Sequence, residues 1–172
     1  MEFNEVIKKR FSVRKFIKKP VGKDIIDKIL NAGHLAPTWC NFQPQRILVI
    51  ESNEALTKLN NCTKCHFDAP LAMLICYNED ETWKRPYDGA ESAPVDAAIV
   101  ATHMMLAATN EGVGSCFVMH FNPQKIREAF NIPCNVIPCA LLVMGYPEPD
   151  CEPLELHYKK RDINEIIYYN NF

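Results

Sequence analysis

The chain has 172 residues, of which 48% are hydrophobic, and its formal net charge is −2. This length suits a single hydrophobic core, and this hydrophobic content excludes an intrinsically disordered chain. No apolar run approaches the roughly 18 residues that a membrane-spanning helix needs, and the start, Met1 to Asn4, has no apolar signal segment, so we expect a cytoplasmic protein without a membrane partner.

Hydrophobic periodicity predicts helices and strands through the first half of the chain. The expected elements are a short helix near Phe3–Ile7, a helix over Pro20–Ala36, a strand over Arg46–Glu51, a helix over Asn53–Asn61 and a strand over Leu71–Tyr77. Pro37 ends the second helix because the residue before a proline avoids helical angles, and Asn53 is expected to cap the third. The last strand is apolar at every position, which predicts burial on both faces of a sheet.

The second half begins with a polar stretch from Asn78 to Ala93 and then alternates again. The expected elements are a helix over Asp96–Glu111, a strand over Ser115–Phe121, a helix over Asn122–Phe130 and a strand over Cys139–Met144. The first of these helices is apolar on nearly all sides, so it should lie in the centre of the fold or between subunits. The pattern predicts an α+β fold, a sheet flanked by helices, with a tail after Pro147 that has no core of its own.

Basic residues crowd the first 23 positions, and some of them have a spacing that suits an anion. Arg10, Ser12 and Arg14 alternate with apolar residues, so on an extended backbone they face one side. Two guanidinium groups and a hydroxyl in that arrangement suit a phosphate. A solvated basic face is the alternative interpretation, and nucleic-acid binding is less favoured because the domain as a whole is not basic.

Two further segments carry groups that bind ligands in other proteins. The loop from Ala36 to Gln45 places hydroxyl, indole and amide groups between two prolines, a combination that suits the edge of a planar heterocycle. A plain capped turn is the alternative. Near the end of the chain, Lys159-Lys160-Arg161 is typical of a solvated charge run unless the fold returns it to Arg10.

Eight cysteines indicate a reducing compartment rather than a disulfide framework. The segment from Cys62 to His66 matches the c-type haem pattern CxxCH. Haem attachment is disfavoured because no export signal is present, and zinc ligation lacks a second spaced pair. We favour two reduced thiols in a loop and expect no metal site, which leaves a redox role open.

Taken together and in this order, the motifs resemble the nitroreductase family over nearly the whole chain. The resemblance rests on the RxSxR start, the loop from Ala36 to Gln45, the glycine-ended helix that leads into Gly112–Phe117, and the late KxR. It implies a three-layer α/β/α fold with a mixed, mostly antiparallel sheet in an intertwined homodimer. It further implies one FMN-binding domain over residues 1–172, with residues 154–172 as a tail that wraps the partner subunit.

The resemblance also implies roles for individual residues. The FMN phosphate would be held by Arg10, Ser12, Lys159 and Arg161. Arg14 would lie at the pyrimidine edge of the flavin. The loop that lines the flavin, partly from the partner, would be Pro37, Thr38, Trp39 and Asn41. The stretch beside the reactive nitrogen would be Val118, Met119 and His120. Trp39 stands where the family usually has a small residue, which predicts a narrower substrate cavity.

The implied activity is transfer of a hydride from NAD(P)H through FMN to a small acceptor such as a nitroaromatic, a quinone or a flavin. Arg14 would stabilise the negative charge that reduction places on the pyrimidine side. His120 is a candidate proton donor, although a lone histidine more often packs or forms hydrogen bonds. The alternatives are dehalogenation, dehydrogenation or flavin fragmentation on the same scaffold, and a flavin-binding module without catalysis. The residues distinguish neither NADH from NADPH nor one acceptor from another.

Overall fold

The computed structural model describes residues 1–172 as six α-helices, four strands and three short 3-10 helices. In chain order the helices and strands are α1 (Phe3–Lys9), α2 (Lys23–His34), β1 (Gln45–Ile50), α3 (Asn53–Asn60), β2 (Leu71–Asn78), α4 (Ala93–Asn110), β3 (Gly114–Val118), α5 (Pro123–Ala129), β4 (Val136–Gly145) and α6 (Glu155–Tyr158). The 3-10 helices are Trp39–Asn41, Glu79–Glu81 and Ile163–Glu165.

The sheet has the strand order β1-β2-β4-β3, and every neighbouring pair is antiparallel. A single parallel bridge joins Ser12 to Ser115 of β3 and supplies the mixed part of the predicted sheet. The register of β2 on β4 shifts where Ile75 pairs with Ala140 and Cys76 pairs with Pro138. Proline has no amide hydrogen to give to the ladder, so a bulge is expected at that point.

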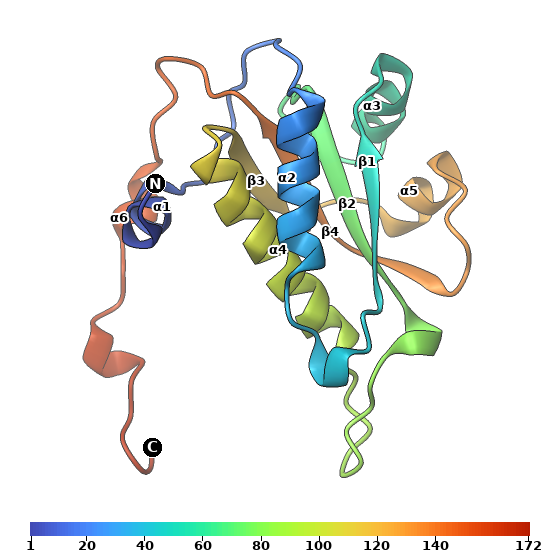
Figure 1. Ribbon diagram of the computed structural model, residues 1–172, viewed down its shortest axis with the longest axis vertical. Helices are drawn as coiled ribbons and strands as arrows, with labels where there is room; N and C mark the ends of the chain where they lie inside the picture. The colour runs from blue at the N-terminus through green and yellow to red at the C-terminus, as the bar shows by residue number, and fades with distance from the viewer.

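Helices cover both faces of this sheet and complete three layers. Side chains of β2 alternate between two buried clusters: Leu71, Met73 and Ile75 lie in the cluster formed with α2 and α4, and Leu74 and Cys76 lie in the one formed with α3 and α5. Figure 1 shows α2 and α4 side by side in front of the sheet. The strand predicted to be buried on both faces is therefore confirmed, as is the α/β/α arrangement.

Most expected elements are present, and their ends differ for local reasons. The N-cap of α3 is Ser52, whose Oγ accepts from the amide of Ala55 at 3.2 Å, so the prediction of Asn53 as the cap was wrong. Helix α4 begins at Ala93 rather than Asp96, because Pro94 is tolerated in a first helical turn. Strand β3 ends at Val118, since the chain turns there and the amide of Phe121 donates to the Met119 carbonyl.

The last segment of the chain has little contact with the body. The rings of Phe11 and His157 lie 6.4 Å apart, which places α6 beside the segment after α1 (Figure 1). Every residue from Tyr158 to Phe172 is exposed. No helix of the structure has the length and apolar character needed to cross a membrane.

Candidate functional site

The Arg10–Arg14 segment is fixed along the edge of β3. The amide of Val13 donates to the Ser115 carbonyl at 3.0 Å, and the Val13 side chain is buried. Gly114 permits this approach, because a Cβ there would lie 2.6 Å from Cγ2 of Val13. Arg14 Nη1 donates to the Ser12 carbonyl at 3.1 Å. The sheet thus holds the backbone of the RxSxR motif in an extended form.

Three predicted residues of this segment affect the pKa of one buried thiol. Burial raises the pKa of Cys116, while the positive charge of Arg14, a hydrogen bond with Ser12 and the charge of Arg10 oppose that rise. Neither arginine forms an ion pair with a carboxylate. Two unpaired guanidinium groups beside a half-buried hydroxyl are a suitable site for an anion.

The loop after α2 contains residues with a strained backbone, and a buried carboxylate of the fold accepts a hydrogen bond from it. Cys40, Asn41 and Gln43 have φ values of 48°, 57° and 52°. Left-handed residues other than glycine cost about 1–3 kcal/mol each and cluster at binding sites. The amide of Trp39 donates to Oδ1 of Asp96 at 2.9 Å, and Asp96 is only 2% exposed.

The same carboxylate accepts from Oγ of Ser92 at 2.8 Å through its second oxygen. Within the loop, the amide of Gln43 donates to Oγ1 of Thr38 at 3.0 Å. Asp96 was expected only as the first residue of a helix. Its role in the loop was missed, because an acidic residue in a first helical turn is common and gives no sign of a distant partner.

An aromatic cavity of about 460 Å³ opens beside this loop. It is lined by Pro37, Thr38, Trp39, Trp83, Arg85, Ala90, Glu91, Ser92, Val95, Asp96 and Ile99. The rings of Trp39 and Trp83 lie 5.0 Å apart with an interplanar angle of 35°. Trp83 belongs to the stretch read from the sequence only as polar, so its part in the cavity was missed. Asn41 is exposed and does not line the cavity.

The end of β3 carries the third group of predicted residues. Val118 is buried, whereas Met119 is 70% exposed and His120 is exposed. Oγ1 of Thr63 donates to the His120 carbonyl at 2.5 Å and accepts from the Cys65 amide at 2.9 Å. The loop that contains the CxxCH pattern is therefore tied to the end of β3, a link that a threonine in a loop does not reveal.

The side chains of the CxxCH pattern face different partners. Cys62 Sγ donates to the Lys58 carbonyl, Cys65 Sγ lies 4.0 Å from Nδ1 of His120, and His66 Nδ1 accepts from the Asp68 amide. No three His, Cys, Asp or Glu side chains are grouped so that they could hold a metal ion. The side chains of Cys62, Cys65 and His66 are therefore close in the sequence but do not form one site.

Two of the three basic residues of the tail form ion pairs with neighbouring acidic residues. Lys159 lies 2.6 Å from Glu155, and Arg161 lies 3.9 Å from Glu165. The contact between His157 and Phe11 nevertheless brings the start of this tail next to Arg10. No hydrogen bond or ion pair joins Lys159 or Arg161 to the RxSxR motif, so their joint role at a phosphate stays a prediction.

Comparisons with known proteins identify the family. The model of the nitroreductase family matches residues 7–72 and 66–146. A crystal structure of a nitroreductase family protein from Clostridium difficile 630 is 41% identical and aligns over 100% of both chains with a TM-score of 0.94. The chain belongs to the nitroreductase family.

Two further relatives have names that state a cofactor or a reaction. A protein from Methanothermobacter thermautotrophicus is 30% identical over 86% of this chain and 78% of its own length, and is named an NADH dehydrogenase/NAD(P)H nitroreductase. The structure of an FMN-dependent nitroreductase from Clostridium difficile R20291 is 26% identical and covers 97% of this chain and 98% of its own, with a TM-score of 0.80. The chain is thus an oxidoreductase of this family.

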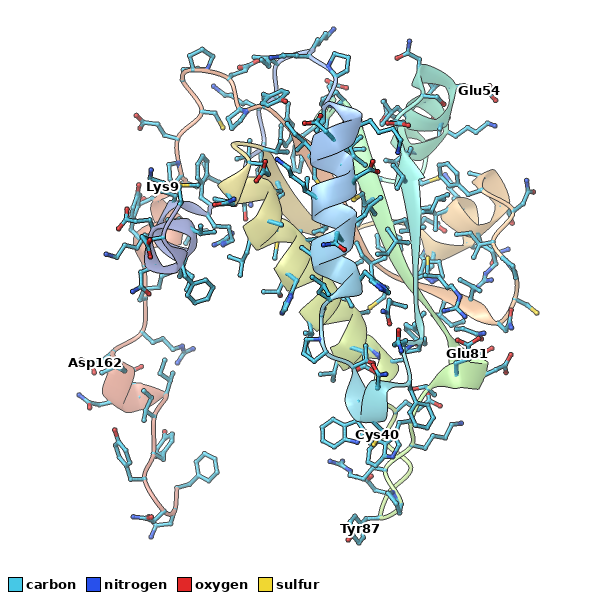
Figure 2. The ribbon with its side chains drawn as sticks, in the orientation of Figure 1. Lys9, Cys40, Glu54, Glu81, Tyr87 and Asp162 are labelled. Carbon is cyan, nitrogen blue, oxygen red and sulfur yellow. The ribbon has the colours of Figure 1, made fainter.

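The candidate residues of this nitroreductase-family chain form two separate groups. None of its hydrogen bonds, ion pairs or ring contacts joins the loop Pro37–Gln43 to Arg10–Arg14 or to Val118–His120. Figure 2 shows Cys40 and Tyr87 together at one end of the molecule, whereas Lys9, next to Arg10, lies well away from them. The candidate residues of one chain therefore lie at two separate places.

Proposed function

We propose that the protein is an FMN-dependent oxidoreductase that takes a hydride from NAD(P)H and passes electrons to a small acceptor, such as a nitroaromatic, a quinone or a flavin. Support comes from membership of the nitroreductase family and from relatives whose names state FMN dependence or the use of NAD(P)H. When bound, FMN supplies the hydride and electron transfer. The task of the chain is then to hold the cofactor and set its electrostatic surroundings.

The observation that carries the proposal is the unpaired cationic segment beside β3. Arg10 and Ser12 have donors available for a phosphate, and the backbone that carries them is fixed by the Val13–Ser115 hydrogen bond. Arg14 would face the pyrimidine edge, where a positive charge favours the anion that reduction creates. No motif for an adenine nucleotide accompanies this segment, so we infer FMN rather than FAD.

We further propose that the protein works as a homodimer in which each flavin contacts both chains. The separation of the two residue groups in one chain supports this arrangement, because the partner would supply Thr38, Trp39 and Asn41 to a flavin held at Arg10–Arg14. The tail provides a second argument. Leu156, Tyr169 and Phe172 are 75%, 82% and 103% exposed, a large apolar surface that a partner subunit would cover.

The aromatic cavity is the proposed place for the acceptor. Its volume of about 460 Å³ lies in the range of small-molecule sites. The Trp39–Trp83 pair gives it planar apolar walls. In the dimer this cavity would adjoin the partner's flavin through the Thr38–Asn41 loop, and planar aromatic acceptors would stack there.

The test is a cofactor and reduction assay on the purified protein. The protein should be yellow, acid should release FMN, and anaerobic NADH or NADPH should bleach the colour, which an acceptor then restores. Recovery of FAD, or of no flavin after reconstitution, would contradict the proposal. A yellow protein that neither nicotinamide bleaches would support a flavin-binding module without catalysis.

A further inference from the structure

A second cavity, without acidic residues, lies beside His120. Its volume is about 660 Å³, and it is lined by Asn60, Asn61, Cys62, Thr63, Lys64, His120, Phe121, Asn122, Pro123 and Lys125. Lys64 and Lys125 form no ion pair. Most other lysines of the structure are paired with an acidic residue. In a chain with a net charge of −2, this groove is neutral or basic throughout.

The groove is firmly attached to the end of β3. Besides the hydrogen bond from Thr63 to the His120 carbonyl, the amide of Asn122 donates to the Cys62 carbonyl at 2.8 Å. Oδ1 of Asn122 accepts from the Lys125 amide at 2.9 Å and so fixes the start of α5. Thr63 is only 6% exposed, which makes this link an interior one. The backbones that carry both lysines are thus held in place relative to His120.

We propose that this groove binds the phosphate end of the reducing dinucleotide and that Lys64 and Lys125 recognise the 2′-phosphate of NADPH. The inference rests on the proposed function, because it needs the flavin ring near His120. NADPH carries a 2′-phosphate monoester that NADH lacks, and this group adds about 1.5 to 2 negative charges at pH 7. Two lysines without acidic neighbours interact with it as point charges. The protein therefore prefers NADPH to NADH.

The experiment measures binding apart from turnover. Adenosine 2′,5′-bisphosphate, AMP and inorganic phosphate are titrated by calorimetry into the full-length protein and into the variants Lys64→Ala and Lys125→Ala. Each variant should lose about fivefold in affinity for the bisphosphate and little for AMP. Lys18→Ala is the matched control, because Lys18 is exposed, forms no ion pair and does not line the groove. That control should bind as the unaltered protein does.

A steady-state assay supplies the second readout. In the two groove variants kcat/KM for NADPH should fall through KM, with kcat and FMN content unchanged, and kcat/KM for NADH should stay the same. Equal affinity for bisphosphate and AMP would overturn the inference. So would inorganic phosphate binding as tightly as the bisphosphate, or the same loss in Lys18→Ala. If the protein holds no flavin, the proposed function fails, while lysine-dependent binding of the bisphosphate still decides the groove.

Discussion

The Arg10–Arg14 segment and the Thr38–Gln43 loop are held in opposite ways. The segment lies extended along a sheet edge, and its two arginine side chains form no ion pair with an acidic residue. The loop has three left-handed residues, and its shape depends on a carboxylate 57 positions away in the sequence. Substitutions in the segment should therefore change ligand affinity, whereas those around the loop should change the fold.

The largest effect is expected from removing the tail, which belongs to neither region but would unite them across a dimer. Deletion of residues 154–172 should give a poorly soluble, colourless protein, because in the proposed dimer the apolar surface that the tail would cover on the partner becomes exposed and neither flavin site is complete. Light scattering and the flavin absorbance measure the result. Tyr87→Ser is the control, since Tyr87 is an aromatic residue outside the tail that is 95% exposed, as the aromatic residues of the tail are largely exposed. A stable yellow monomer, full-length or truncated, would contradict the homodimer.

The next largest effect concerns the hydrogen bond between Asp96 and the loop. Asp96→Ala should lower the free energy of unfolding by about 3 kcal/mol, because it leaves the Trp39 amide and the Ser92 hydroxyl without an acceptor inside the fold. Urea titration measures this loss. Asp96→Asn is the matched variant: its amide oxygen still accepts from Trp39, so we expect a loss of only about 1 kcal/mol. Equal losses of unfolding free energy in the two variants would show that the hydrogen bonds accepted by Asp96 do not stabilise the loop.

These two regions also show what the residue pattern predicts and what it misses. Periodicity predicted β2 and the position of α4 because apolar spacing directly reports burial. The motif spacing predicted that Arg10, Ser12 and Arg14 form one group because the three residues are close neighbours on one extended segment, and their role as ligands stays a prediction. Asp96 and Thr63 were missed as anchors: each bonds a residue 57 positions away, and such a link leaves no local pattern. Trp83 was missed because its partner Trp39 is also remote in sequence.

A substitution at Gly114 tests how the sheet positions the cationic segment. In Gly114→Ala the new Cβ would lie 2.6 Å from Cγ2 of Val13 and 3.0 Å from Cγ of Pro147, so the segment must move away from β3. We expect FMN affinity to fall about tenfold or more, with a loss of stability of about 1–3 kcal/mol. Fluorescence titration of the apoprotein with FMN measures the affinity. Unchanged FMN affinity would mean that the segment does not hold the cofactor.

Gly89→Ala serves as the comparison for this variant. Gly89 has a positive φ of 72°, and a Cβ there meets nothing within 4 Å. That change should strain only the turn that carries it and leave FMN affinity unaltered. Loss of FMN in both variants would point to general destabilisation rather than to the segment.

The smallest effects should separate the two arginines from each other. Arg10→Ala removes a phosphate partner, so FMN retention should fall about tenfold, the ratio that roughly 1.4 kcal/mol represents, while the reduction potential of the remaining bound flavin stays the same. Arg14→Ala removes the positive charge proposed for the pyrimidine edge. The potential should drop by roughly 30 mV, which equals about 1.4 kcal/mol for a two-electron couple, and reduction by NAD(P)H should slow.

Arg14→Lys keeps the charge and should restore most of the potential but less of the binding, since lysine cannot form the same paired hydrogen bonds. Potentiometry of the three variants beside the unaltered protein decides the assignment. An unchanged potential in Arg14→Ala would place that guanidinium away from the ring, and a shifted potential in Arg10→Ala would exchange the two roles.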